Sequence, residues 1–484
     1  MEHQLLIGKY TLESLTNGLY VTPFDLYREY VQNAADAIDQ AEEEGVLRKN
    51  EGCIEISINS SLKRISIKDN GTGVKSNDVL SNLIDIGNSQ KRLSKSRGFR
   101  GIGRLSGLGY CDQLNFKTSA YQENLATVVS YDTKLLKKLL SPQENTRDSI
   151  NDVLQKVVKI YTIPEKESRH YFEVELIGIN EEIHLLDERE VIEYLRQNLP
   201  VPYSSDFVWG SLIKQKLNQC GVIIDEYEIE LLSNGNCQSI RKPYTNHVLS
   251  DRIRRIDDEI NDIRFREFWI DGQLSAVLWY ADTDFWGTVL SNEIKGIRVR
   301  QGNILIGDNN SLRHCFREER FNGWLVGELH IIDERIIPNT RRDDYEKNDT
   351  YRKLLNQLNE WAVDISKQIR HRSYERSLSD SQKEFLKADK YLINNEKHKE
   401  ISTGTELDMY DLDDSDSVAS TDLLSKISIL MSMGNNVTKY NILNMNPKMT
   451  MEQKRTVARV FDILYANYSK TKANGIVQSI IENF

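Results

Sequence analysis

Residues 29–37 read EYVQNAADA, a stretch in which three polar side chains stand among small alanines. Thr22, Pro23 and Asp25 come just before it and predict a helix start, because threonine caps helices, proline suits a first turn and an acid favours the positive end of the helix dipole. Gly45 is a typical helix stop. We therefore expect one helix from about residue 23 to residue 44.

The three polar residues of this helix share one face. Glu29, Asn33 and Asp36 follow one another at spacings of four and three, which aligns side chains along a helix. A solvated helix surface produces the same pattern by chance, and a catalytic helix produces it by necessity. The segment alone does not decide between the two.

Composition describes an ordinary globular chain. Its 484 residues are too many for one compact core, so we expect two or three domains. No apolar run reaches the roughly 20 residues of a membrane span, no secretory signal begins the chain, and five scattered cysteines form no CxxC pair. We expect a cytoplasmic protein without membrane contact. The net charge of −10 disfavours nucleic acid as the main partner without excluding a local basic patch.

Two glycine-rich stretches follow the helix. DNGTGV (69–74) ends a strand-like alternation, and it is either a hairpin turn or a place where backbone approaches a flat ligand. RGFRGIGRLSGLG (97–109) offers successive backbone N–H groups that suit phosphates. It is not a Walker A loop, because no GK[ST] ends it.

Together and in this order, the three motifs resemble the GHKL ATPase superfamily, which includes DNA gyrase B, the ninety-kilodalton heat-shock chaperones, histidine kinases and MutL. The matching patterns are E-x-x-x-N-A-x-D-A, D-x-G-x-G and G-x-x-G-x-G. The resemblance implies an α+β fold, with a GHKL (Bergerat) ATP-binding α/β sandwich first. It also implies ATP and Mg²⁺ as cofactors.

The resemblance assigns a role to each motif residue. Glu29 would be the base that activates the attacking water, and Asn33 would hold the Mg²⁺ that bridges the phosphates. A base in this position favours the hydrolytic branch over histidine kinases, and no phosphoacceptor box is visible. The remaining predicted nucleotide contacts are Asp69 with the adenine amino group, Gly71 and Gly73 in the base pocket, Asn82 before the lid, and Gly98, Gly101 and Gly103 at the phosphates.

A second match lies further along the chain. SNEIKGIRVRQGNILIGDNN (291–310) and LHIIDERIIPNTRRDDYEKN (329–348) resemble the middle segment of the heat-shock chaperones. The match places Arg342 on the arginine that reaches the ATP site in that family, and a forked guanidinium suits phosphate oxygens. The alternative is a surface pair, Arg341 with Arg342, bridged to the acids that follow. One departure is clear: Tyr171-Phe172-Glu173 stands where the family has the Gly-Thr that helps to bind adenine.

The pattern of elements and linkers predicts five parts. Pro200 and Pro202 mark the first boundary, and residues 406–416 hold six acids and no base, as disordered linkers do. From residue 350 the apolar residues recur at helical spacing. The predicted parts are a GHKL ATP-binding domain (1–203), a middle, transducer-like α/β domain (204–348), an amphipathic helical segment (349–400), an acidic linker (401–421) and a C-terminal helical module (422–484).

These observations favour an ATP-hydrolysing, Mg²⁺-dependent clamp of the heat-shock-chaperone type, in which ATP closes a lid and then a homodimer around a protein client. A MutL- or MORC-like DNA-associated clamp in repair or anti-phage defence is the alternative, motivated by the RIRR segment (252–255). A nucleotide-sensing scaffold that does not hydrolyse ATP is a third interpretation.

Overall fold

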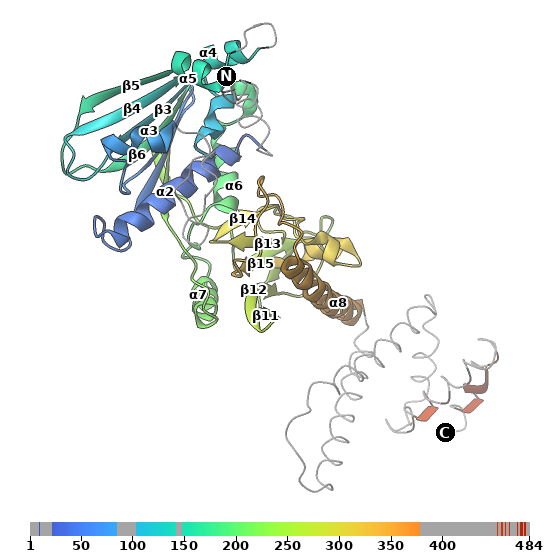
Figure 1. The fold of residues 1–484 in the computed structure, drawn as a ribbon. Helices are drawn as coiled ribbons and strands as arrows, with labels where there is room; N and C mark the ends of the chain where they lie inside the picture. The colour runs from blue at the N-terminus through green and yellow to red at the C-terminus, as the bar shows by residue number, and fades with distance from the viewer. Residues whose placement is uncertain are drawn as a thin grey trace, which may run out of the picture. The chain divides into compact units, whose positions relative to one another are not determined.

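The computed structural model describes residues 22–84, 103–141 and 148–377, with Lys9 and isolated positions between Gln453 and Ile480. Met1–Ser373 form one compact unit and Tyr374–Phe484 a second (Figure 1). The described positions from 453 to 480 are helical, whereas the predicted acidic linker (401–421) lies outside the described residues. Among the residues that the structure describes, no helix combines the length and the apolar character that a membrane crossing needs.

The first sheet has eight strands in the order β5-β4-β3-β6-β2-β1-β7-β8. Its β1 and β7 run parallel, and every other pair of neighbours is antiparallel, so the sheet is mixed. The strands are β1 (Cys53–Asn59), β2 (Arg64–Asp69), β3 (Gln113–Ser119), β4 (Leu125–Asp132), β5 (Val158–Pro164), β6 (Tyr171–Ile177), β7 (Glu228–Ser233) and β8 (Asn236–Ser239).

The strand pair that the alternation predicted is confirmed. β1 and β2 pair antiparallel with Ile56 opposite Ile67, and both side chains are buried. Strict alternation gives such a sheet one buried face, and α2 (Asp25–Glu43) packs on it over β1 and β2. The buried face of α2 and the inward residues of the strands form one core. This α+β arrangement is the fold that the motifs predicted.

The ends of α2 follow different rules. Glu44 is its C-cap and Gly45 follows with φ +74°, so the predicted stop is confirmed. The predicted cap at Thr22 is wrong: Phe24 occupies the N-cap and makes no side-chain bond. Instead the Asp25 carboxylate accepts the backbone N–H of Thr22 at 3.2 Å. The backbone carbonyl of Thr22 accepts the N–H of Asp25 in return, at 3.1 Å, so the threonine closes this turn with its backbone and not with its hydroxyl.

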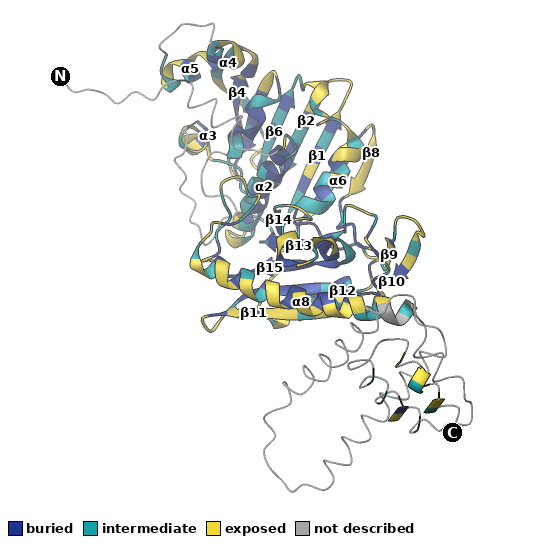
Figure 2. Cartoon of the chain, turned by 90° about the vertical axis from the view of Figure 1, so that its right-hand side faces the viewer, coloured by how far each residue is buried: buried dark blue, intermediate teal, exposed yellow. Residues whose placement is uncertain are grey.

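The second sheet has five strands in the order β11-β12-β15-β13-β14, with β13 and β15 parallel. α8 (Asp349–Ser377) covers one of its faces, and Figure 2 shows the exposed outer residues of that helix. A second core, with α7 (Gly210–Gln219), forms on the other side. The strands are β11 (Asp262–Ile270), β12 (Gln273–Asp282), β13 (Gly296–Gln301), β14 (Ile304–Ile306) and β15 (Val326–Ile331), and β9 (His247–Ser250) and β10 (Ile256–Glu259) form a separate pair.

The first sheet extends beyond the boundary that the prolines predicted. β7 and β8 lie beyond Pro202 in sequence and still belong to the first sheet. The division at residue 203 therefore stays a prediction, within a unit that Met1–Ser373 form together. The remaining helices are α3 (Val79–Leu83), α4 (Thr133–Leu140), α5 (Ile150–Val157) and α6 (Glu188–Asn198), and the short 3₁₀ turns are η1 (Ser76–Asp78), η2 (Gly103–Gly109), η3 (Glu181–Ile183), η4 (Arg313–Cys315) and η5 (Glu319–Trp324).

Candidate functional site

Glu29 lies between two arginines. Its side chain is 14% exposed, and its Oε1 is 3.7 Å from Nε of Arg28, the preceding residue of α2. The same oxygen is 4.0 Å from Nε of Arg342, at the outer limit of an ion pair. Arg342 belongs to the segment after β15, in the second sheet, and its side chain is 16% exposed. The structure thus brings together the two residues that the sequence proposed as base and arginine.

A glycine lies directly against the Glu29 carboxylate. Gly103 opens η2, and a Cβ added to it would be 2.4 Å from Oε2 of Glu29, closer than real contacts allow. Tyr30 holds η2 in this place, because its hydroxyl accepts the N–H of Gly107 at 2.9 Å and donates to the carbonyl of Arg104 at 3.1 Å. Burial raises the pKa of Tyr30, so the hydroxyl keeps the proton that it donates. Gly98 and Gly101 lie outside the described residues.

Two amides follow Glu29 on α2. Asn33 is half-buried, and its amide has no hydrogen-bond partner among the described residues. Gln32 is 1% exposed, and neither its oxygen nor its nitrogen bonds to any residue that the structure describes. Buried amides without partners are rare in folded proteins and call for a ligand or water. An amide oxygen is a hard ligand of the kind Mg²⁺ accepts, so Asn33 fits the metal that the family implies.

The DNGTGV loop packs tightly on α2. Asp69 is buried at the end of β2, and its Oδ1 accepts the N–H of Gly71 at 2.8 Å. A Cβ on Gly71 would lie 2.6 Å from the carbonyl carbon of Ala37, so this contact requires glycine. Gly73 has φ +65°, and a Cβ there would be 2.0 Å from the carbonyl oxygen of Ser119. The small residues of EYVQNAADA thus make room for the loop.

Two residues that the sequence did not single out hold this loop from the opposite side. Thr118 on β3 accepts the N–H of Val74 at 2.7 Å and donates to the carbonyl of Tyr171 at 3.1 Å. The Nδ1 of His170 bonds the carbonyl oxygen of Gly71 at 2.8 Å. Both partners come from distant parts of the chain, and no spacing rule connects them.

The neighbour of Asp69 is aromatic. Phe172 on β6 pairs with Asp69 and also with Thr118, so these three residues form one row across β2, β6 and β3. The ring of Phe172 stacks on Phe116 with centroids 5.9 Å apart. An aromatic ring therefore lies in the stretch that departs from the family's Gly-Thr. Asn82, the other predicted contact, is exposed on α3, and its role stays a prediction.

Comparison with known proteins agrees with this geometry. Residues 23–159 match the family described as histidine kinase-, DNA gyrase B- and HSP90-like ATPases. The chaperone protein HtpG of Wigglesworthia glossinidia brevipalpis is 28% identical over 135 residues, which cover 24% of this chain and 21% of that protein. The chain thus spans about a fifth of the length of this curated relative. Residues 23–159 thus resemble GHKL-type ATPases, and the resemblance that the motifs indicated is confirmed for this part of the chain.

Proposed function

We propose that this chain is an ATP-hydrolysing, Mg²⁺-dependent conformational clamp, similar to the heat-shock chaperones. The approach of Arg342 to Glu29, at 4.0 Å, carries the proposal. A helix of the first sheet and a loop of the second meet at one carboxylate, as a site that both parts assemble would require. The family supports ATP binding and hydrolysis in general, and the roles below are our proposal.

Each residue has a task that its chemistry suits. Glu29 takes a proton from the attacking water, and Arg342 places its fork on oxygens of the γ-phosphate. Asn33 offers its amide oxygen to Mg²⁺, whose charge would offset that of the phosphates. Asp69 accepts the amino group of adenine while its other contact, the N–H of Gly71, fixes the carboxylate.

The same geometry makes hydrolysis depend on the contact between the two sheets. The base belongs to one sheet and the arginine to the other, so turnover needs both parts in place, while binding needs the first alone. We propose that ATP favours the arrangement in which they meet, and that a homodimer closes with it around a protein client. HtpG is named a chaperone, and a cytoplasmic location would agree with this proposal.

The test compares three alanine variants with the wild type in ATP turnover, ATP binding and molecular mass, with and without a non-hydrolysable ATP analogue. Glu29→Ala and Arg342→Ala should each lower kcat about 100-fold or more while ATP still binds. Arg341→Ala is the matched control, because it removes the neighbouring, exposed arginine and should leave kcat unchanged.

The possible outcomes test the base, the arginine and the dimer closure separately. Equal turnover for wild type and Glu29→Ala would reject the proposed base, and equal loss in both arginine variants would reject a specific role for Arg342. A wild type that binds ATP tightly without hydrolysing it would favour the nucleotide-sensing scaffold. A mass that does not change with the analogue would reject ATP-driven closure of a dimer.

One ordered loop supports the DNA-associated alternative. Between β9 and β10, Ile253 is 93% exposed at a turn, with Arg252, Arg254 and Arg255 around it. The loop is well held, because Oδ1 of Asp251 accepts the N–H groups of Ile253 and Arg254 at 2.9 and 3.1 Å. An apolar tip between arginines is the combination that minor-groove binders insert into DNA.

Filter retention of duplex DNA would separate the two functions. The DNA-associated clamp predicts retention that depends on ATP and falls as salt rises, and that weakens in Arg252→Ala and Arg255→Ala. Absence of retention at low salt would reject this alternative and leave the chaperone-like clamp untouched.

A further inference from the structure

Arg342 stands at the tip of a hairpin-like arm, residues 337–346. Backbone hydrogen bonds close the arm, from the N–H of Glu346 to Ile337 at 2.9 Å and from the N–H of Asn339 to Asp344 at 2.9 Å. The N–H of Arg342 bonds the carbonyl of Asn339 at 3.2 Å. The arm is therefore a small, closed structure, and its orientation decides where Arg342 points.

The tip of the arm has a strained backbone and is bonded to the segment after β14. Arg342 has φ +58°, a region that side-chain-bearing residues seldom adopt and that surrounding contacts must impose. Its carbonyl accepts the N–H of Gly307, just after β14, at 2.9 Å. Gly307 has φ +74°, and a Cβ there would lie 2.9 Å from the carbonyl oxygen of Asp343. The tip rests on the second sheet through a contact that requires glycine.

The side of the arm is bonded to the first turn of α8. The hydroxyl of Tyr351 donates to Oδ1 of Asp344 at 3.0 Å. Burial acts to raise the pKa of Asp344, but hydrogen bonds from Lys347, the N–H of Tyr345 and Tyr351 outweigh it and hold the pKa below its usual value. Asp344 is thus a carboxylate, and its bond to Tyr351 is assisted by that charge. Asp344 lies two residues after Arg342.

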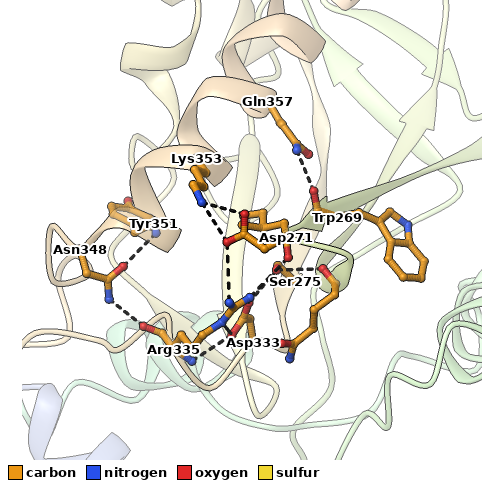
Figure 3. A network of polar contacts seen from close by, with 11 residues as sticks. Trp269, Asp271, Ser275, Asp333, Arg335, Asn348, Tyr351, Lys353 and Gln357 are labelled. Carbon is orange, nitrogen blue, oxygen red and sulfur yellow. Dashed lines mark hydrogen bonds and ion pairs between the residues drawn. The ribbon is translucent and has the colours of Figure 1, made fainter.

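The base of the arm is fixed by the network drawn in Figure 3. Asn348 bonds both ways: its Oδ1 accepts the N–H of Tyr351 at 2.9 Å, and its amide donates to the carbonyl of Arg335 at 2.7 Å. Arg335 donates to the buried Asp333, which also accepts the hydroxyl of Ser275 on β12 at 2.7 Å. These bonds tie the arm's base to the sheet.

The same network fastens α8 itself. Lys353 donates to Oδ1 of Asp271, in the turn between β11 and β12, at 2.7 Å, and Gln357 donates to the carbonyl of Trp269 at 2.8 Å (Figure 3). α8 is therefore bonded both to the second sheet and to the arm. A shift of its first turn would reach Asp344 through the hydroxyl of Tyr351, whose ring also contacts that of Tyr345 in the arm with centroids 5.2 Å apart.

We propose that Tyr351 is a positioning residue for Arg342: it couples α8 to the arm and so sets where the guanidinium meets Glu29. The inference rests on the role of Arg342 in the proposed function. Tyr351 touches no reacting group, and it acts only through Asp344 and the arm. A displacement of α8 then changes the rate of turnover without changing the pocket that holds adenine.

The test uses Tyr351→Phe in the full chain, with Tyr244→Phe as matched control. Tyr244 also donates from a buried hydroxyl to a carboxylate, Glu328, at 3.0 Å, and has no bond to the arm. Tyr351→Phe should lower kcat about tenfold with KM for ATP unchanged, and Tyr244→Phe should leave kcat unchanged. In the Arg342→Ala background, Tyr351→Phe should lower kcat no further.

Hydrogen exchange of the arm's amides provides a readout that needs no turnover. Tyr351→Phe should speed exchange in residues 337–346, and Tyr244→Phe should not. Unchanged exchange there, or a kcat loss that multiplies with that of Arg342→Ala, would overturn the inference while the proposed function stands. A wild-type kcat in Arg342→Ala would instead reject the arginine's role, and the exchange result would still decide whether Tyr351 holds the arm.

Discussion

Substituting Gly103 with alanine tests how closely the η2 backbone approaches the proposed base. The added Cβ would lie 2.4 Å from Oε2 of Glu29, while ordinary contacts begin at 3.4 Å, so the carboxylate must move by about 1 Å. The obstructing atom is the far end of a flexible side chain, which can move at small cost to folding. A misplacement of about 1 Å at a reacting group lowers the rate about 100-fold, or about 2.7 kcal/mol in the barrier.

We therefore expect Gly103→Ala to separate chemistry from stability. Its kcat should fall about 100-fold, while its melting temperature stays near that of the wild type. Steady-state ATPase assays and thermal melts measure the two effects. Gly323→Ala is the control, because a Cβ there would meet its nearest atom at 3.5 Å, an ordinary contact.

Two outcomes would refute this reasoning. A wild-type kcat in Gly103→Ala would mean that the position of the Glu29 carboxylate does not limit turnover. A large fall in the melting temperature would mean that η2 itself, and not the carboxylate, had to move.

Three further substitutions test the packing of Gly71 on α2 and the buried charges of Lys242, Glu328 and Arg300. Gly71→Ala should cost about 1–3 kcal/mol, because its Cβ would press on the backbone of Ala37 at 2.6 Å, and thermal melts with KM measurements would check it. Glu328→Gln should cost about 3–5 kcal/mol in urea unfolding, because it leaves the buried cations of Lys242 and Arg300 without their partner; Lys242→Met should cost less, because Arg300 still neutralises Glu328. Burial lowers the pKa of Lys242 to about 7, below its unfolded value. The unfolded chain then binds more protons above about pH 7, so stability should rise from there towards about pH 10, and Lys242→Met should lose that rise. Parallel pH curves for the two proteins would contradict this.

Local patterns predicted those parts of the site that lie on one element. The face of α2 follows from helical spacing, and the turn after β2 follows from alternation that ends in glycine. Arg342 was proposed because its segment resembles a known one, and the structure places its guanidinium 4.0 Å from Glu29, while its role stays a prediction. Each of these signals lies within about twenty residues, where periodicity and turn chemistry operate.

The contacts that join these elements could not be predicted. Tyr30 bonds η2 across more than seventy positions, and His170 reaches Gly71 across ninety-nine. Such bonds depend on which strands become neighbours, and sheet order is a global result of burial that no local period records. The cap of α2 failed for a smaller reason: the N–H of Asp25 bonds the backbone carbonyl of Thr22 and not its hydroxyl, and the Asp25 carboxylate in turn accepts the N–H of Thr22.

Glu29 belongs to a locally predictable helix and also makes contacts with distant elements. Its carboxylate is approached by Gly103 from the nucleotide loop and by Arg342 from the arm, so it responds to the geometry of both. On the proposed function, changes in the first sheet's loops would alter ATP binding and turnover together, because these loops would also shape the adenine pocket. Changes in the arm or in the first turn of α8 would alter turnover alone, because these segments would touch no part of that pocket. On the proposed function, the second sheet therefore controls the rate of hydrolysis and leaves the affinity for ATP to the first.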